Sequence, residues 1–108
     1  SDLKFHEGFM RLKAEGFKVD AIAPQAAIYL TVRLDLKGMH TADGKVLSDQ
    51  KAVTQFILDQ AKLAVVPFSA FGASDDSSWY RLSVGTCDKS EIDEVFQRLR
   101  TALSGLKA

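Results

Sequence analysis

The chain has 108 residues, which is enough for one compact domain and marginal for two. Its 14 basic and 14 acidic residues leave no net charge and hydrophobic residues make up 46%, so the composition is that of a soluble globular domain and gives no electrostatic reason to expect a nucleic acid or an anionic membrane as partner. No apolar run approaches a membrane span, no signal segment opens the chain, and the single cysteine, Cys87, cannot form an internal disulfide, so we expect a cytoplasmic protein.

The first predicted element is a helix over residues 2–15, followed by Gly16 at the position of a left-handed C-terminal cap. Gly8 weakens the middle of this helix, because glycine is a poor helix former. The expected buried stripe is imperfect and comprises Leu3, Phe9, Met10 and Lys13, with Phe5 and Leu12 beside it.

Two extended segments come next. The first covers residues 17–22 and is interrupted by Pro24. The second, over 26–36, alternates polar residues with apolar ones, which are Ile28, Leu30, Val32 and Leu34. Such alternation is typical of a strand in a sheet that helices cover on one side. Gly38 and the Asp43-Gly44 pair predict the loop that follows.

Ser48 or Asp49 is expected to cap a second helix that ends near Lys62. Its predicted buried face follows the i, i+3, i+4 spacing of Val53, Phe56, Ile57, Gln60 and Ala64. A short buried strand over 64–68, ended by its proline, then leads into a loop over 69–78. This loop consists of small and acidic residues and contains Phe71-Gly72. Loops of this kind beside a strand are common places for binding sites.

The chain is organised around the strand predicted over residues 79–86. Its core face contains Tyr80, Leu82 and Val84, and its other face contains Trp79, Arg81 and Ser83. Arg81 suits the bidentate capture of a carboxylate or phosphate, because a guanidinium keeps its charge and has a fixed fork of donors. The alternative is an edge-strand arginine that extends to water or pairs with a nearby aspartate.

Asp88 and Glu91 form a potential capping box for a third helix, with Ser90 and Asp93 as a competing choice. The apolar stripe of this helix runs to the end of the chain through Ile92, Val95, Phe96, Leu99, Leu103 and Leu106. The order helix, strand, strand, helix, strand, strand, helix predicts one α/β domain over 1–108. We expect a small mixed β-sheet with helices packed mainly on one face.

Other motifs give little support for chemistry. Ser1 and Ser48 each begin an S-x-x-K pattern, but the companion motifs that would make it meaningful are missing. His6 and His40 lack metal-ligand spacing with Cys87, so no metal site is predicted. Cys87 itself is expected to be a small packed residue at a strand-to-helix junction rather than a reactive thiol.

Three segments with a particular spacing carry a resemblance to a known family. They are Pro24-Gln25-Ala26-Ala27-Ile28-Tyr29-Leu30, Val65-Val66-Pro67-Phe68-Ser69-Ala70-Phe71-Gly72 and Tyr80-Arg81-Leu82-Ser83. With the closing amphipathic helix, they resemble the C-terminal small domain of class I/II, fold-type I aminotransferases, the pyridoxal-phosphate enzymes of the aspartate aminotransferase superfamily. The resemblance implies that Arg81 binds the α-carboxylate of the substrate and that Phe71 and Gly72 lie, as weaker candidates, near the substrate entrance. The family usually has glycine where this chain has Phe68.

The same resemblance implies what the rest of such an enzyme supplies. The Schiff-base lysine, the aspartate that pairs with the pyridine nitrogen and the phosphate cradle belong to an upstream large domain, and no lysine here stands in the family's lysine motif. The resemblance therefore implies a fragment that is inactive alone and binds no pyridoxal 5'-phosphate productively. The full-length enzyme would be a homodimer that transfers an amino group between an amino acid and a 2-oxo acid.

Two other interpretations stay open. The chain could be a stand-alone small-molecule-binding or regulatory α/β module that uses Arg81 to hold an anionic ligand, or a purely structural interaction domain. A reading frame that continues upstream into a lysine-bearing domain would favour the enzyme. Tight binding of amino acids by the chain alone, without cofactor, would favour the module. The donor amino acid is not specified by this sequence.

Overall fold

The computed structural model describes residues 2–23, 29–83 and 88–108. The predicted order of elements is confirmed, with one addition, because a short 3₁₀ helix begins the predicted loop. The elements are α1 (Asp2–Ala14), β1 (Val19–Ile22), β2 (Tyr29–Leu34), α2 (Gln50–Ala61), β3 (Val65–Pro67), the 3₁₀ helix η1 (Phe68–Phe71), β4 (Trp79–Ser83) and α3 (Lys89–Ser104). Parts of two predicted strands lie outside the described residues: the start of the second, with Ile28, and the end of the last, with Val84. Cys87 also lies outside them.

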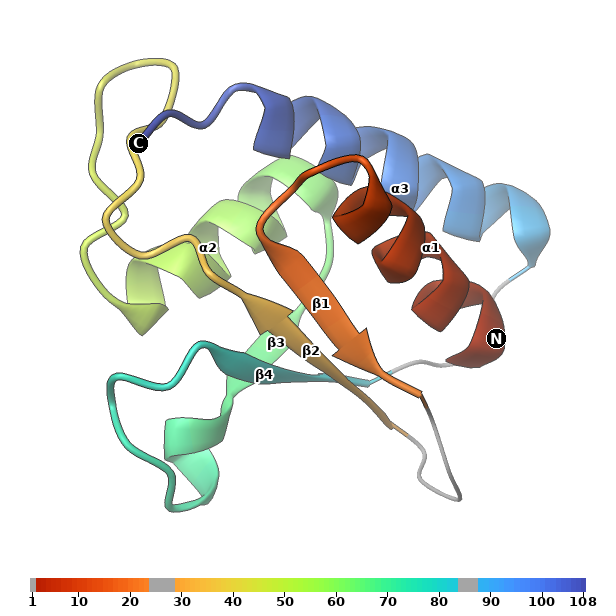
Figure 1. Ribbon diagram of the computed structural model, residues 1–108, viewed down its shortest axis with the longest axis horizontal. Helices are drawn as coiled ribbons and strands as arrows, with labels where there is room; N and C mark the ends of the chain where they lie inside the picture. Colours follow the sequence, from red (N-terminus) through yellow and green to blue (C-terminus); the bar gives the residue numbers. More distant parts are fainter. Residues whose placement is uncertain (1, 24–28, 84–87) are drawn as a thin grey trace.

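The four strands form one sheet in the order β1-β2-β4-β3. The α/β class with helices on one face is confirmed, and each described pairing is antiparallel where the prediction had a mixed sheet. Figure 1 shows α1, α2 and α3 on one side of the sheet and η1 on the other. Because β4 lies between β2 and β3, Arg81 is on an internal strand, and the edge-strand alternative is wrong in that respect.

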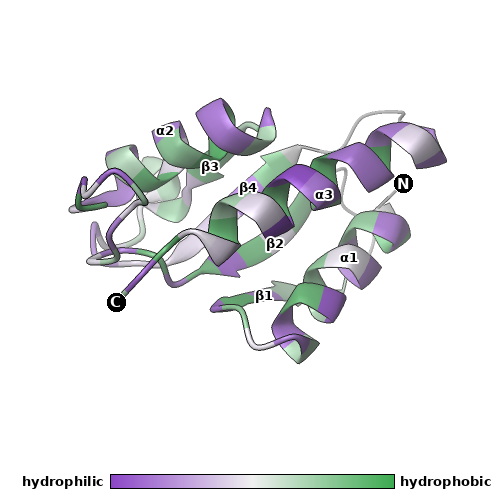
Figure 2. Ribbon diagram, turned by 90° about the horizontal axis from the view of Figure 1, so that it is seen from above, coloured by the Kyte–Doolittle hydropathy of each residue, from purple (hydrophilic) through white to green (hydrophobic). Residues whose placement is uncertain are grey.

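The core lies between the sheet and the helix layer. Its fully buried side chains include Phe9, Leu12, Leu30, Val32, Leu34, Val53, Ile57, Tyr80, Leu82 and Leu99. In Figure 2 hydrophobic and hydrophilic segments alternate along each helix, as expected for amphipathic helices that cover a sheet. None of the helices in the described ranges combines the length and the apolar character that crossing a membrane requires.

Asp49 and Asp88 cap the two later helices as predicted. The Asp49 side chain accepts a hydrogen bond from the backbone N–H of Ala52, and Asp88 forms a complete capping box with Glu91. Lys62, at φ 58°, ends α2 in the left-handed region.

Two predicted faces need correction. On α2 the buried face contains Gln50 and Ala61, and Gln60 and Ala64 are exposed. The strand predicted as buried is the edge strand β3, in which Val65 is buried but Val66 is 43% exposed. Successive side chains of a strand point to opposite faces, and one face of β3 is turned to solvent, so only alternate residues reach the core.

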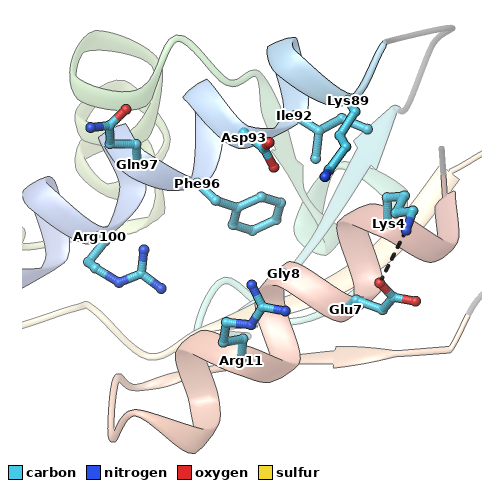
Figure 3. A pocket seen from close by; sticks show the side chains of 10 residues that line it. All are labelled: Lys4, Glu7, Gly8, Arg11, Lys89, Ile92, Asp93, Phe96, Gln97 and Arg100. Carbon is cyan, nitrogen blue, oxygen red and sulfur yellow. Dashed lines mark ion pairs between the residues drawn. The ribbon is translucent and has the colours of Figure 1, made fainter.

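The predicted stripe of α1 is correct at Phe9 and Met10, which packs against the core, and wrong at Leu3 and Lys13, which are exposed. The buried residues are Phe5, Phe9 and Leu12, whereas Leu3 is 66% exposed. Figure 3 shows the Phe96 ring of α3 lying beside Gly8 of α1, in contact with the rings of Phe5 and Phe9 at centroid distances of 5.6 and 5.3 Å. Glycine at position 8 therefore lets the two helices approach closely enough for this aromatic cluster to form.

Candidate functional site

Arg81 lies on the face of the sheet that the helices leave uncovered. Its neighbours in β4, Tyr80 and Leu82, are 0% and 1% exposed and point into the core. Since successive side chains of a strand point to opposite faces, Arg81 is directed away from the helix layer. Its Cα partners are Thr31 of β2 and Val66 of β3.

Three aromatic rings surround the Arg81 guanidinium. Its Cζ lies 3.9 Å from the ring centroid of Tyr29, 4.0 Å from that of Phe71 and 5.7 Å from that of Phe68. Tyr29 is the diagonal cross-strand neighbour, two residues from the direct partner Thr31, and such pairs are within reach of long side chains. Rings at these distances attract a cation through their quadrupoles, so they favour the charged guanidinium without neutralising it.

The charge of Arg81 has no counter-ion in the described part of the chain. No described carboxylate lies within ion-pair distance of it, and its Nε–H is buried without a hydrogen-bond acceptor. Buried donors without a partner are rare in folded proteins, because they lose hydration and gain nothing in exchange. An anion with two oxygens would supply the missing acceptor and the missing charge together.

Arg33 lies on the same face of the sheet as Arg81, but it has acidic partners within the chain. Its Nε lies 2.9 Å from Asp35 Oδ2, without hydrogen-bond geometry, and its guanidinium reaches Asp20 Oδ2 at 3.8 Å. The pKa of the Asp20 carboxyl is held below its ordinary value by a hydrogen bond from Lys13, by the N–H of Ala21 and, more weakly, by Arg33. These acids balance the charge of Arg33, whereas the charge of Arg81 is left available.

The structure brings Phe71 to Arg81, and Gly72 follows it at the end of η1; a place for either residue near a substrate entrance stays a prediction. Phe71 is 52% exposed and its ring covers the guanidinium. Gly72 ends η1 at φ 97°, in the region that favours glycine, and it has no side chain to contact a ligand. Sequence reasoning missed Tyr29 and Phe68 as neighbours of Arg81. The alternation in β2 could have placed Tyr29 on the same face as Arg81. For Phe68 the signal was a phenylalanine where the family usually has glycine.

A concavity with a volume of about 710 Å³ lies on the helix side of the molecule, between α1 and α3. Two of the lining cations have acidic partners. Lys4 pairs with Glu7 at 3.9 Å, as Figure 3 shows, and Arg100 binds Glu15 through two hydrogen bonds of 2.9 Å. This concavity does not include Arg81. Within the described ranges no group of three or more metal-ligating side chains occurs.

Comparison with protein families gives one assignment. The family model described as aminotransferase class I and II matches residues 4–99. Curated relatives include probable aspartate/prephenate aminotransferases of Rickettsia prowazekii (strain Madrid E), 32% identical over 84 residues, and of Rickettsia bellii (strain RML369-C), 33% identical over 84 residues. Each alignment covers 77% of this chain and 20% of the relative. The chain thus spans about a fifth of the length of these relatives.

Solved structures show the same fold. The aspartate aminotransferase of Rhizobium meliloti superposes with a TM-score of 0.77 at 27% identity, over 97% of this chain and 25% of that one. The tyrosine aminotransferase of Leishmania infantum superposes with a TM-score of 0.73 at 20% identity, over 98% of this chain and 24% of that one.

Proposed function

The chain belongs to the aminotransferase class I and II family, and on this premise we propose that it is the substrate-carboxylate-binding C-terminal domain of a pyridoxal-phosphate-dependent aminotransferase. Its coverage of about a fifth of the relatives supports a domain within a larger enzyme. The reaction would be the transfer of an amino group between an amino acid and a 2-oxo acid. By itself the domain would be inactive.

The observation that carries this proposal is the unbalanced charge of Arg81 among three aromatic rings. A substrate α-carboxylate would meet the guanidinium in the bidentate arrangement that charge and geometry favour. Fixing the carboxylate fixes the substrate's Cα–H bond relative to the catalytic groups, and such orientation lowers the barrier. The rings of Tyr29 and Phe71 would exclude water from the ion pair and strengthen it.

The residues described around Arg81 do not fit the cofactor itself. Pyridoxal 5'-phosphate needs a lysine amino group and a phosphate cradle. The described neighbours of Arg81 include no lysine; they are Tyr29, Thr31, Val66, Phe68 and Phe71. The proposal therefore assigns the cofactor to the upstream large domain and only the carboxylate to this chain. It also includes a cytoplasmic, homodimeric full-length enzyme.

The test compares two arginines of the same sheet face in the full-length enzyme. Arg81→Ala should raise KM for the amino acid and lower kcat/KM by roughly 30- to 5,000-fold, because a charge-assisted bidentate contact is worth about 2–5 kcal/mol. Arg33→Ala is the matched control and should change kcat/KM less than about threefold. Near-normal kinetics for Arg81→Ala, or equal damage from both substitutions, would contradict the proposal.

A calorimetric titration of the 108-residue chain separates this function from the alternative module. The chain alone should bind amino acids and dicarboxylates only weakly, because most of the substrate's contacts would lie in the upstream domain. Tight binding without cofactor would instead indicate a stand-alone module that recognises anions.

A further inference from the structure

Gln50 is the buried polar side chain of the described core, with 8% of its surface exposed. It is the first residue of α2, directly after the cap Asp49, a position where side chains commonly face solvent. Burying an amide is unfavourable unless both its donor and its acceptor are satisfied. The contacts that satisfy Gln50 therefore indicate what its burial achieves.

Both contacts of the Gln50 side chain lead to the segment between β3 and β4. Its Nε2 donates to the backbone carbonyl of Ser77 at 2.8 Å, and its Oε1 accepts from the hydroxyl of Ser69 at 2.6 Å. Ser69 lies within η1, and Ser77 stands two residues before β4 begins. One amide thus ties the two ends of this segment to the same point of α2.

The tied segment has few other means of support. Residues 70–76 are exposed, so they have no buried side chain to anchor them. The 3₁₀ helix has no side-chain cap at its N-terminus, and among helices and strands it packs against β3 and β4. Lys37 adds one exposed hydrogen bond, to the carbonyl of Asp76 at 2.7 Å. The position of η1 therefore depends strongly on Gln50.

The rings that η1 presents are the ones that hold Arg81. Phe71 and Phe68 pack edge to face at 6.3 Å and both lie over the guanidinium. Arg81 has no ion pair in the described structure, so ring contacts take the place of an acid in fixing its direction. A displacement of η1 would remove one side of this support and leave the guanidinium free to turn.

We propose that Gln50 is a positioning residue for Arg81: it fixes η1 through Ser69 and Ser77, and η1 fixes the guanidinium through Phe71. The inference rests on the proposed function of Arg81. It predicts that Gln50, at the start of α2 and in direct contact with η1 rather than with Arg81, controls affinity for the substrate carboxylate.

Kinetics of the full-length enzyme test this inference with three variants. Gln50→Leu removes both hydrogen bonds at similar volume. It should lower kcat/KM for the amino acid by about tenfold or more, mainly through a higher KM, because misplaced binding groups cost about this much or more. Ser69→Ala removes one bond and should give a smaller rise. Gln55→Leu is the control, because Gln55 lies on the exposed face of the same helix and bonds only Asp59 among the described contacts.

A double substitution tests the route of the effect. If Gln50 acts through Phe71, then Gln50→Leu should add less than about twofold in KM to a Phe71→Ala enzyme, because the contact it supports is already gone. Independent, additive effects would overturn the route. A lowered melting temperature for Gln50→Leu with KM unchanged would overturn the positioning role altogether.

A readout that needs no substrate separates failure of this inference from failure of the proposed function. In the 108-residue chain, which closes its own core, ring currents of Tyr29 and Phe71 should displace the Arg81 Nε–H resonance from that of a solvent-exposed arginine. Gln50→Leu should move this resonance toward the exposed value and Gln55→Leu should not. An unmoved resonance overturns the inference, whereas normal kinetics for Arg81→Ala with a moved resonance overturns only the proposed function.

Discussion

The contact between Gly8 and Phe96 predicts an unusual sign for a common stabilising substitution. Gly8 lies in the middle of α1, where Gly→Ala normally gains about 1 kcal/mol of stability through helix propensity. Here the added Cβ would stand 2.6 Å from Cε1 of the Phe96 ring and closer still to Cζ and Cε2. Atoms at such distances must move apart.

The Phe96 ring cannot move without loss. It is 9% exposed and touches both Phe5 and Phe9, and each aromatic pair contributes about 0.5–1.5 kcal/mol beyond its buried area. Overpacking of a core usually costs about 1–3 kcal/mol. Against the propensity gain of about 1 kcal/mol, we expect Gly8→Ala to lower the free energy of unfolding by up to about 2 kcal/mol.

Urea denaturation of the 108-residue chain measures this change, and a second background tests its cause. In a Phe96→Leu background the smaller side chain leaves room for the methyl group, so Gly8→Ala should stabilise by up to about 1 kcal/mol. A reversal of sign between the two backgrounds is the expected result. Stabilisation of similar size in both would refute the steric argument.

Tyr80 and Thr31 of the sheet and Phe71 of η1 each give a further prediction. The hydroxyl of Tyr80 is buried without a partner in the described chain, so Tyr80→Phe should leave unfolding free energy unchanged or raise it by about 1 kcal/mol. Burial raises the pKa of Tyr80 to about 12, so between pH 10 and 12 the hydroxyl ionises in the unfolded state before it ionises in the folded state. The unsubstituted protein should therefore lose about 2–3 kcal/mol of unfolding free energy as pH rises through this range. Denaturation measured against pH should show that Tyr80→Phe removes this loss. Phe71→Leu should lower kcat/KM of the full-length enzyme by roughly 3- to 30-fold, the equivalent of one cation–π contact, while the melting temperature of the half-exposed site stays the same. Thr31→Asp would place a carboxylate opposite Arg81, which should stabilise the sheet by about 0.2–1 kcal/mol and raise KM for the amino acid. The control Thr31→Asn should have neither effect. An unchanged KM in the Thr31→Asp enzyme would count against a carboxylate site at Arg81.

Elements that are determined by residues close together in the sequence were predictable from it. The third helix has its cap, its capping-box partner and its apolar stripe within one segment, and the structure confirms the capping box at Asp88. The alternation in β4 likewise predicted which side of the strand holds Arg81, because Tyr80 and Leu82 are buried. In both cases the information lies within a few residues of its consequence.

Features that depend on distant contacts were not predictable in the same way. The face that α1 buries depends on Phe96, which is far along the chain, and the predicted stripe wrongly included Leu3, which is exposed. The position of Tyr29 beside Arg81 depends on strand register, and η1 is tied to Gln50 by side-chain hydrogen bonds. Propensity contains no information about such pairings, since tertiary packing decides them.

The two arginines of the uncovered sheet face indicate why the ring contacts matter. Arg33 has Asp35 two residues later in the chain and Asp20 near its guanidinium, so this cation is balanced by acids of the fold. An acid in the same relation to Arg81 would compete with any ligand carboxylate for the guanidinium. Aromatic rings avoid this competition, because they attract the cation through their faces and leave the Nε–H without an acceptor in the described part of the chain. Holding an arginine with rings rather than acids therefore keeps it both oriented and able to bind an anion, as the proposed carboxylate site would require.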